Sequence, residues 1–163
     1  MEPLLKCKDL KKIYFRKSAL NGLNLEINQG RITGLLGPNG SGKTTFLKIA
    51  AGILKQSSGE IFINGNKPGV KTKSQVSYLP DKDYIFKWMR INDAIDFFND
   101  MYNDFDRNKA LELLKFMNLE EESKVKTLSR GMCEKFYLTL VLARKAKLYI
   151  LDEPLGGVHP VTR

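Results

Sequence analysis

The sequence predicts an α/β fold, and three stretches of the chain carry that prediction. A glycine-rich loop at residues 37–45 stands between an apolar stretch and a helical one, which is the context of a phosphate-binding loop. Residues 90–119 have the spacing of amphipathic helices. Residues 147–154 are an apolar run that ends in two carboxylates and is typical of a parallel sheet covered on both faces.

Two segments that alternate between apolar and polar residues open the chain. Residues 4–13 look like an edge strand, and residues 18–27 look like a half-buried strand that ends in a turn at residues 28–30. We expect these segments to form an antiparallel sheet. Tyr14 lies between them, and from the residues alone it is either an aromatic that stacks on a base or a core residue.

The phosphate-binding loop matches the spacing G-x-x-x-x-G-K-[ST] at every fixed position. Glycines let backbone N–H groups turn toward a phosphate, and the helix expected over residues 44–51 would point its positive end at the same anion. Residues 31–36 read as the strand before the loop. The residues expected to hold phosphate are Gly37, Pro38, Asn39, Gly40, Ser41, Gly42, Lys43, Thr44 and Thr45.

The middle of the chain changes from strands to helices. Residues 60–66 are a predicted strand with a hairpin-type turn, and residues 76–80 are a second strand that Pro80 stops. Between residues 90 and 119 we expect two helices, with Asp106 as a cap, whose aromatic side chains pack internally or, on the outer side, contact a partner. Another helix, capped by Ser129, is expected to run to residue 144.

Composition excludes several classes of protein. The chain has 163 residues, 42% hydrophobic and 28% charged, with no apolar run long enough for a signal peptide or a membrane span, so we expect a cytoplasmic protein. Cys7 and Cys133 lack metal-ligand spacing and are expected to be reduced. The net charge of +9 is consistent with binding to nucleic acid or to an anionic membrane leaflet, and with attraction of ATP. The lysines are scattered, however, which favours the interpretation that they form a solvated face.

Three motifs in this order resemble the ATP-binding domain of ABC transporters. They are the phosphate loop, the stretch Leu128-Ser129-Arg130-Gly131-Met132, and the strand ending Asp152-Glu153-Pro154. The resemblance runs from about residue 4 to the last residue. It implies a P-loop NTPase core with a front antiparallel β-subdomain and, at about residues 88–128, an inserted α-helical subdomain. All of these would belong to one ATP-binding domain, residues 1–163, incomplete at its C-terminus.

The chemistry of such a site needs ATP and Mg²⁺. Lys43 is suited to the β- and γ-phosphates, and the Thr44 hydroxyl to Mg²⁺. Asp152 is expected to hold the ion through water, because Mg²⁺ takes few protein carboxylates. Glu153 is expected to polarise the attacking water as general base.

The resemblance also implies a second, facing ATP-binding domain. In the family two such domains meet head to tail, and the signature stretch of one reaches the γ-phosphate held by the other. Here Ser129 and Gly131 keep the family's residues, whereas Arg130 and Met132 depart from them. Tyr14 matches the aromatic on which the family stacks adenine.

Three further departures concern turnover. Asp81 replaces the family's glutamine, which contacts the metal and the attacking water, and we expect Asp81 to keep these contacts although its charge changes the electrostatics. His159 replaces an aspartate after the catalytic strand. The chain ends ten residues after Glu153, before the family's switch histidine and last strands, so the resemblance implies a C-terminally truncated member.

Three functions follow from these observations. The first is an ATPase that, as a homodimer or heterodimer, drives a transporter, with some similarity to bacterial exporters. It would lie on the inner face of the membrane through separate transmembrane permease subunits. The alternatives are a soluble relative that acts on nucleic acid, disfavoured because neither tandem domains nor a long coiled coil is present, and a fragment that only binds ATP.

Overall fold

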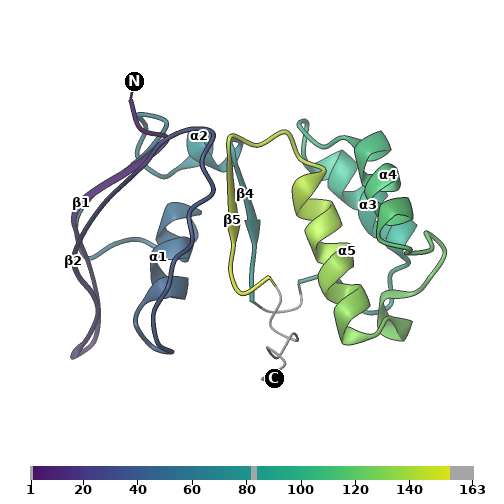
Figure 1. Cartoon of the computed structure of the whole chain (residues 1–163), viewed down its shortest axis with the longest axis horizontal. Helices are drawn as coiled ribbons and strands as arrows, with labels where there is room; N and C mark the ends of the chain where they lie inside the picture. The colour runs from purple at the N-terminus through teal and green to yellow at the C-terminus, as the bar shows by residue number, and fades with distance from the viewer. Residues whose placement is uncertain (1, 82–83, 155–163) are drawn as a thin grey trace, which may run out of the picture. The chain divides into compact units, whose positions relative to one another are not determined.

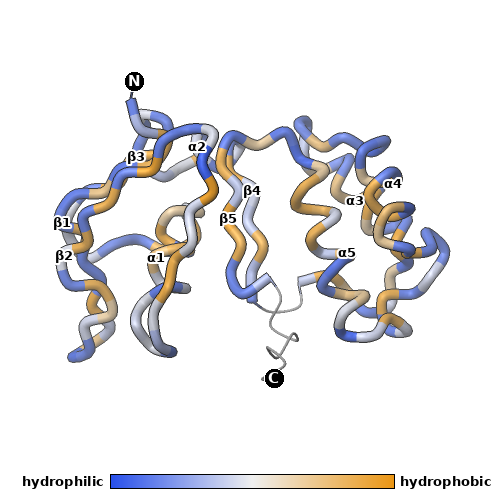
Figure 2. The backbone as a smooth tube through the Cα atoms, in the orientation of Figure 1, coloured by the Kyte–Doolittle hydropathy of each residue, from blue (hydrophilic) through white to orange (hydrophobic). Residues whose placement is uncertain are grey.

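The computed structural model describes residues 2–81 and 84–154 of the chain. Its contacts divide the chain into two compact units, Met1–Val76 and Ser77–Arg163. Figure 1 labels most of the helices and strands of both units, and β3 is labelled in Figure 2.

Unit 1 contains a three-stranded antiparallel sheet. Strand β1 (Leu5–Tyr14) pairs with β2 (Lys17–Ile27) on one side and with β3 (Ser58–Ile63) on the other. The predicted antiparallel sheet is confirmed, but the prediction that residues 4–13 form an edge strand is wrong, because β1 lies in the centre. Alternation of side chains reports that one face of a strand is exposed, and it carries no information on whether both edges are paired.

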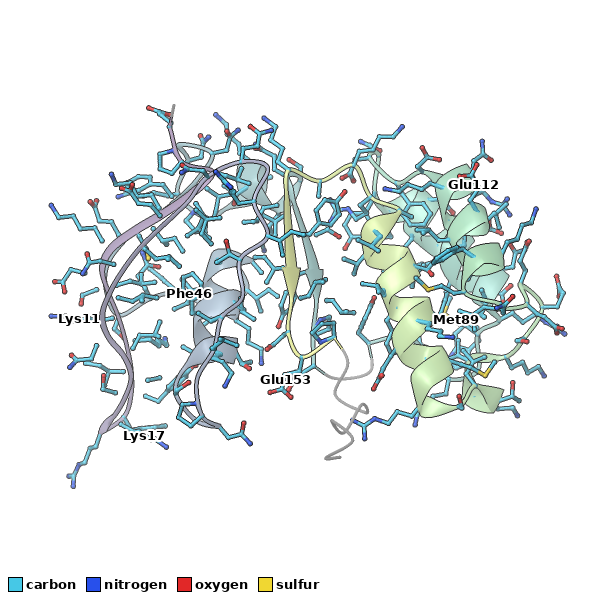
Figure 3. The ribbon with its side chains drawn as sticks, in the orientation of Figure 1. Lys11, Lys17, Phe46, Met89, Glu112 and Glu153 are labelled. Atoms are coloured by element: carbon cyan, nitrogen blue, oxygen red, sulfur yellow. The ribbon has the colours of Figure 1, made fainter. Side chains whose placement is uncertain are left out.

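Both this sheet and the first helix bury apolar side chains. Leu5, Cys7 and Leu10 are buried along β1, with a register shift between Cys7 and Leu10, and Cys7 is a free thiol whose pKa is raised by burial. Helix α1 (Lys43–Ala50) buries Phe46, which Figure 3 shows on the side of the helix that faces the hairpin strands. A short helix that the sequence did not predict, α2 (Val70–Lys73), follows β3.

The strand predicted before the phosphate loop is absent from the described structure. Residues 31–36 form no strand, and Ile32 and Leu36 are 105% and 93% exposed. An apolar parallel strand is stable only when neighbouring strands take up its backbone N–H and C=O groups. None of the five strands among the described residues pairs with this segment, so residues 31–36 do not form the strand that their sequence predicts.

Unit 2 combines a small sheet with helices. Strands β4 (Val76–Leu79) and β5 (Leu148–Leu151) form a two-stranded sheet, and the Asp152 N–H donates to Leu79 O at 2.9 Å, so the two strands end side by side. The sequence predicts that residues 147–154 form a strand of a parallel sheet covered on both faces. Among the described residues β5 pairs with β4 alone and Tyr149 is partly exposed, so this prediction is not met.

The helices of unit 2 surround a continuous apolar core. They are α3 (Ile91–Met101), α4 (Arg107–Phe116), the 3-10 turn η1 (Val125–Thr127) and α5 (Arg130–Leu142), and Figure 2 shows both hydrophobic and hydrophilic residues along the three α-helices. Phe98, Phe105 and Phe136 are buried in this core, whereas Phe97 and Phe116 are exposed.

Two predicted caps fix where these helices begin. The Asp106 carboxylate accepts a hydrogen bond from the Lys109 N–H at 3.0 Å, and the Ser129 hydroxyl accepts one from the Met132 N–H at 3.3 Å. Both satisfy N–H groups that the first turn of a helix leaves open. In the described part of the chain, no helix is long and apolar enough to cross a membrane.

Candidate functional site

The phosphate loop of unit 1 is a turn closed by its own backbone and by one lysine. The Ser41 N–H donates to Pro38 O at 3.2 Å, and the Lys43 ammonium donates to Gly37 O at 2.8 Å and to Pro38 O at 3.0 Å. The loop carbonyls therefore hold the ammonium at the loop. A cation fixed in this way is one of the groups that phosphate oxygens need.

Gly42 allows this loop to lie in close contact with strand β2 of the antiparallel sheet. Its φ of 93° lies in the left-handed region, and a Cβ placed on it would come within 2.2 Å of Ala19 O and 3.0 Å of Leu20 Cδ2. Glycine is therefore required here both by conformation and by the close approach of β2. Because Ala19 and Leu20 belong to the hairpin that carries Tyr14, loop and hairpin are fixed to each other within unit 1.

The N-terminus of α1 has no acidic side chain of its own. Gly42 provides no side-chain cap, and the first turn contains no acidic residue. The positive end of the helix dipole is consequently not neutralised by the helix itself. The loop and this helix end together make the strongest candidate for a phosphate site in the chain.

Tyr14 is a surface aromatic of unit 1 and not a core residue. It is 42% exposed and lies at the end of β1, where the Lys12 ammonium is 5.1 Å from the centre of its ring. This exposure excludes the interpretation, left open by the sequence, that Tyr14 is a core residue. Its stacking on a base stays a prediction.

In unit 2 the two carboxylates after β5 have opposite environments. Asp152 is 2% exposed, and the Tyr78 hydroxyl donates to its Oδ2 at 3.3 Å, whereas Glu153 is exposed and adopts a positive φ of 51°. Burial, followed by the Asp152 charge, raises the pKa of Tyr78, so this phenol remains a donor at neutral pH. A left-handed conformation at a non-glycine residue is costly and is often found at functional sites.

Glu153 shares a pocket with Asp81. The pocket has a volume of about 350 Å³ and lies inside unit 2 between the strand ends, η1 and the start of α5. Lys87, Lys126 and Arg130 line it together with these two carboxylates, so charges of both signs face the same space. The structure thus brings together two predicted site residues 72 positions apart in sequence.

The signature residues lie at the start of α5. Ser129 is the N-cap and Gly131 is in the first turn, where a Cβ added to the glycine would meet nothing within 4 Å. The Ser129 hydroxyl oxygen accepts from the helix, which leaves its own proton available for donation to another oxygen. His159, the other residue singled out from the sequence, lies outside the described residues.

Sequence reasoning missed Tyr78 as the partner of Asp152 and the basic residues of the pocket. Tyr78 is 74 positions from Asp152, and no local spacing could reveal that pair. Among the described residues no group of three or more histidine, cysteine or acidic side chains is arranged to hold a metal. The Thr44 hydroxyl of unit 1 and the Asp152 carboxylate of unit 2 are each oxygen donors of the kind that Mg²⁺ prefers.

Comparison with known proteins identifies the family. The model of the ABC transporter family matches residues 20–156. The chain belongs to this family. The match spans the phosphate loop, the signature stretch and both carboxylates, and the P-loop NTPase fold predicted from the sequence is confirmed.

Relatives within the ABC transporter family include two proteins of Bacillus subtilis. The linearmycin resistance ATP-binding protein LnrL is 29% identical over 98% of this chain and 54% of its own length. The SkfA peptide export ATP-binding protein SkfE is 32% identical over 95% of this chain and 67% of its own length. The chain therefore spans about half of the first relative and two thirds of the second.

A solved ABC protein has the same fold. A putative ABC transporter ATP-binding protein from Pyrococcus furiosus superposes with a TM-score of 0.84 at 29% identity, over 95% of this chain and 78% of that one.

Proposed function

We propose that this chain is the ATP-binding part of a transporter ATPase that hydrolyses Mg²⁺-ATP to drive export through separate membrane-spanning subunits. The observation that carries the proposal is the phosphate loop, in which Lys43 is held over the loop carbonyls and Gly42 is seated on β2. Membership of the ABC transporter family supports it. The direction of transport rests on the name of the relative SkfE, which describes peptide export.

Each candidate residue has a task that its surroundings support. Lys43 and the N–H groups of the loop bind the phosphates, and the exposed ring of Tyr14 stacks on adenine. Thr44 and buried Asp152 would hold Mg²⁺, which would neutralise charge at the phosphates when bound. Tyr78 orients Asp152 through its hydrogen bond.

The remaining residues act on the attacking water and on the partner's nucleotide. Exposed Glu153 polarises the water as general base, and Asp81 in the same pocket helps to orient it. Ser129 and Gly131 donate to the γ-phosphate bound by the second domain of a head-to-tail homodimer or heterodimer. We place the protein on the inner face of the cell membrane, where permease subunits hold it.

Binding and hydrolysis of ATP by the chain and three variants test this proposal. Lys43→Ala removes the cation at the phosphates and is expected to abolish binding of a fluorescent ATP analogue. Glu153→Gln is expected to keep binding and to lower hydrolysis by about 10²- to 10⁴-fold, the usual contribution of a general base. Glu134→Gln is the matched control, because it changes another carboxylate of the same pocket and should leave hydrolysis unchanged.

Two results would contradict the proposal. If Glu153→Gln hydrolysed ATP as fast as the unchanged chain, Glu153 would not be the general base. Binding of the analogue without any turnover would instead favour a protein that only binds ATP, the alternative raised by the sequence.

A further inference from the structure

The net charge of the chain is confined to unit 1. Of the 27 basic and 18 acidic residues, 13 and 4 lie in residues 1–76, while 14 of each lie in residues 77–163. The whole excess of +9 therefore belongs to the first unit, and the second is neutral overall. If the basic residues served only to keep the surface solvated, their excess would not need to lie in one unit.

Part of this charge gathers at the free end of the β1–β2 hairpin, which we call the hairpin patch. Its members are Lys12, Ile13, Phe15, Arg16, Lys17 and Lys55. Strand register places Tyr14 opposite Lys17, and the Lys12 ammonium donates to Lys55 O at 2.8 Å, so the loop after α1 joins the hairpin. Figure 3 shows Lys17 at the tip of the hairpin.

The cations of the hairpin patch are not neutralised by neighbouring acids. No acidic residue occurs between Asp9 and Glu26, and no ion pair joins Lys12, Arg16 or Lys17 to a carboxylate in the described part of the chain. Their positive field is consequently directed at whatever approaches the tip of the hairpin.

Exposed apolar side chains are interleaved with these cations. Phe15 is 104% exposed with a positive φ of 51°, and Ile13 is half exposed. Apolar groups flanked by Lys and Arg are typical of segments that enter the boundary between lipid headgroups and acyl chains. Single-stranded nucleic acid would use the ring of Phe15 for stacking but has no use for an aliphatic side chain such as Ile13.

We propose that the hairpin patch binds directly to an anionic phospholipid surface. Phe15 and Ile13 enter the interface, and Lys12, Arg16, Lys17 and Lys55 lie against the phosphate headgroups. This contact is made by the chain itself, in addition to any attachment through a permease. Tyr14, the proposed adenine contact, lies between Ile13 and Phe15, but vesicle binding can be measured without nucleotide. The proposal can therefore hold or fail separately from the function proposed above.

Sedimentation with phospholipid vesicles tests the hairpin patch. The full chain is mixed with vesicles of phosphatidylcholine alone or of phosphatidylcholine with phosphatidylglycerol, at several salt concentrations. We expect binding to the anionic vesicles only, and release as salt screens the charges. Each basic residue near such a surface contributes about a five-fold factor in partitioning, so Arg16→Ala with Lys17→Ala should weaken binding roughly 25-fold.

Two further variants separate charge from apolar insertion. Phe15→Ser keeps every cation and should weaken binding by about ten-fold, because it removes a side chain that would be buried in the interface. Lys109→Ala with Lys115→Ala removes the same number of exposed cations from α4 in unit 2 and should leave binding unchanged. Tyr14 is kept in all variants because it is a candidate base contact.

Several outcomes would overturn the proposal. Equal binding to neutral vesicles, an unchanged affinity of the Arg16 and Lys17 double variant, or an equal loss in the Lys109 and Lys115 control would each do so. Displacement from vesicles by a single-stranded oligonucleotide, with an affinity for it that falls steeply with salt and exceeds that for vesicles, would assign the patch to nucleic acid instead. Analogue binding and the thermal melt of each variant show whether its ATP site and fold are intact.

Discussion

Replacing Gly42 by alanine tests whether the phosphate loop is seated on β2 as the structure shows. An L-residue at a φ of 93° costs about 1–2 kcal/mol. The new Cβ would also lie 2.2 Å from Ala19 O, and a backbone atom cannot move aside as a flexible side chain can. Forced overpacking of this kind costs about 1–3 kcal/mol more, so we expect Gly42→Ala to lower the free energy of unfolding by about 2–5 kcal/mol.

Two other glycines provide matched controls for this substitution. Gly40 has a φ of 79° but nothing within 4 Å of a Cβ, so Gly40→Ala should show only the conformational cost of about 1–2 kcal/mol. Gly34 has neither feature, and Gly34→Ala should change stability by less than about 1 kcal/mol. Urea unfolding followed by circular dichroism measures all three. Equal losses for Gly42→Ala and Gly40→Ala would refute the contact with Ala19.

Other predictions concern the core and caps of unit 2, and urea unfolding measures each of them. Arg144 is 5% exposed and makes two hydrogen bonds of 3.1 Å to Asp104, so Asp104→Ala should cost about 3 kcal/mol by removing the carboxylate that pairs with this buried guanidinium; no loss would contradict that pairing. Phe136→Ala should cost about 3–5 kcal/mol because the ring is fully buried, and a loss near zero would place it at the surface. The Lys109 N–H, followed by Lys145, holds the pKa of Asp106 below its usual value. Its charge therefore stabilises the fold above about pH 4 and ceases to do so as the pH falls through that lowered pKa. Since asparagine caps equally well, Asp106→Asn should lose stability near neutral pH and match the unchanged chain in acid, whereas a difference independent of pH would exclude this linkage.

Local signals were sufficient for the elements that are stabilised locally. The caps Asp106 and Ser129, the helical spacing of residues 91–101 and the phosphate-loop pattern are each contained within a few turns of chain. The antiparallel hairpin was likewise readable, because its two strands are consecutive and joined by a short turn.

Features that depend on distant partners could not be predicted in this way. Residues 31–36 have the composition of a strand but no neighbour to pair with among the described residues, and β1 is central because β3, whose residues lie 47 to 58 positions from their partners, joins it. The contact between Tyr78 and Asp152 and the pocket shared by Asp81 and Glu153 also join separate parts of the sequence. The charge division became visible only when the contacts had defined the two units.

The pairing of β4 with β5 has a consequence for the order in which unit 2 folds. These strands join residues 76–79 to residues 148–151, and α3, α4 and α5 all lie in the segment that their pairing closes. Local helical contacts form faster than pairings between distant strands, and a collapsed helical core shortens the chain that must be closed. We therefore expect the helices to form before the two strands pair, since β4 leaves the ribosome before β5, its partner in the described structure, has been synthesised.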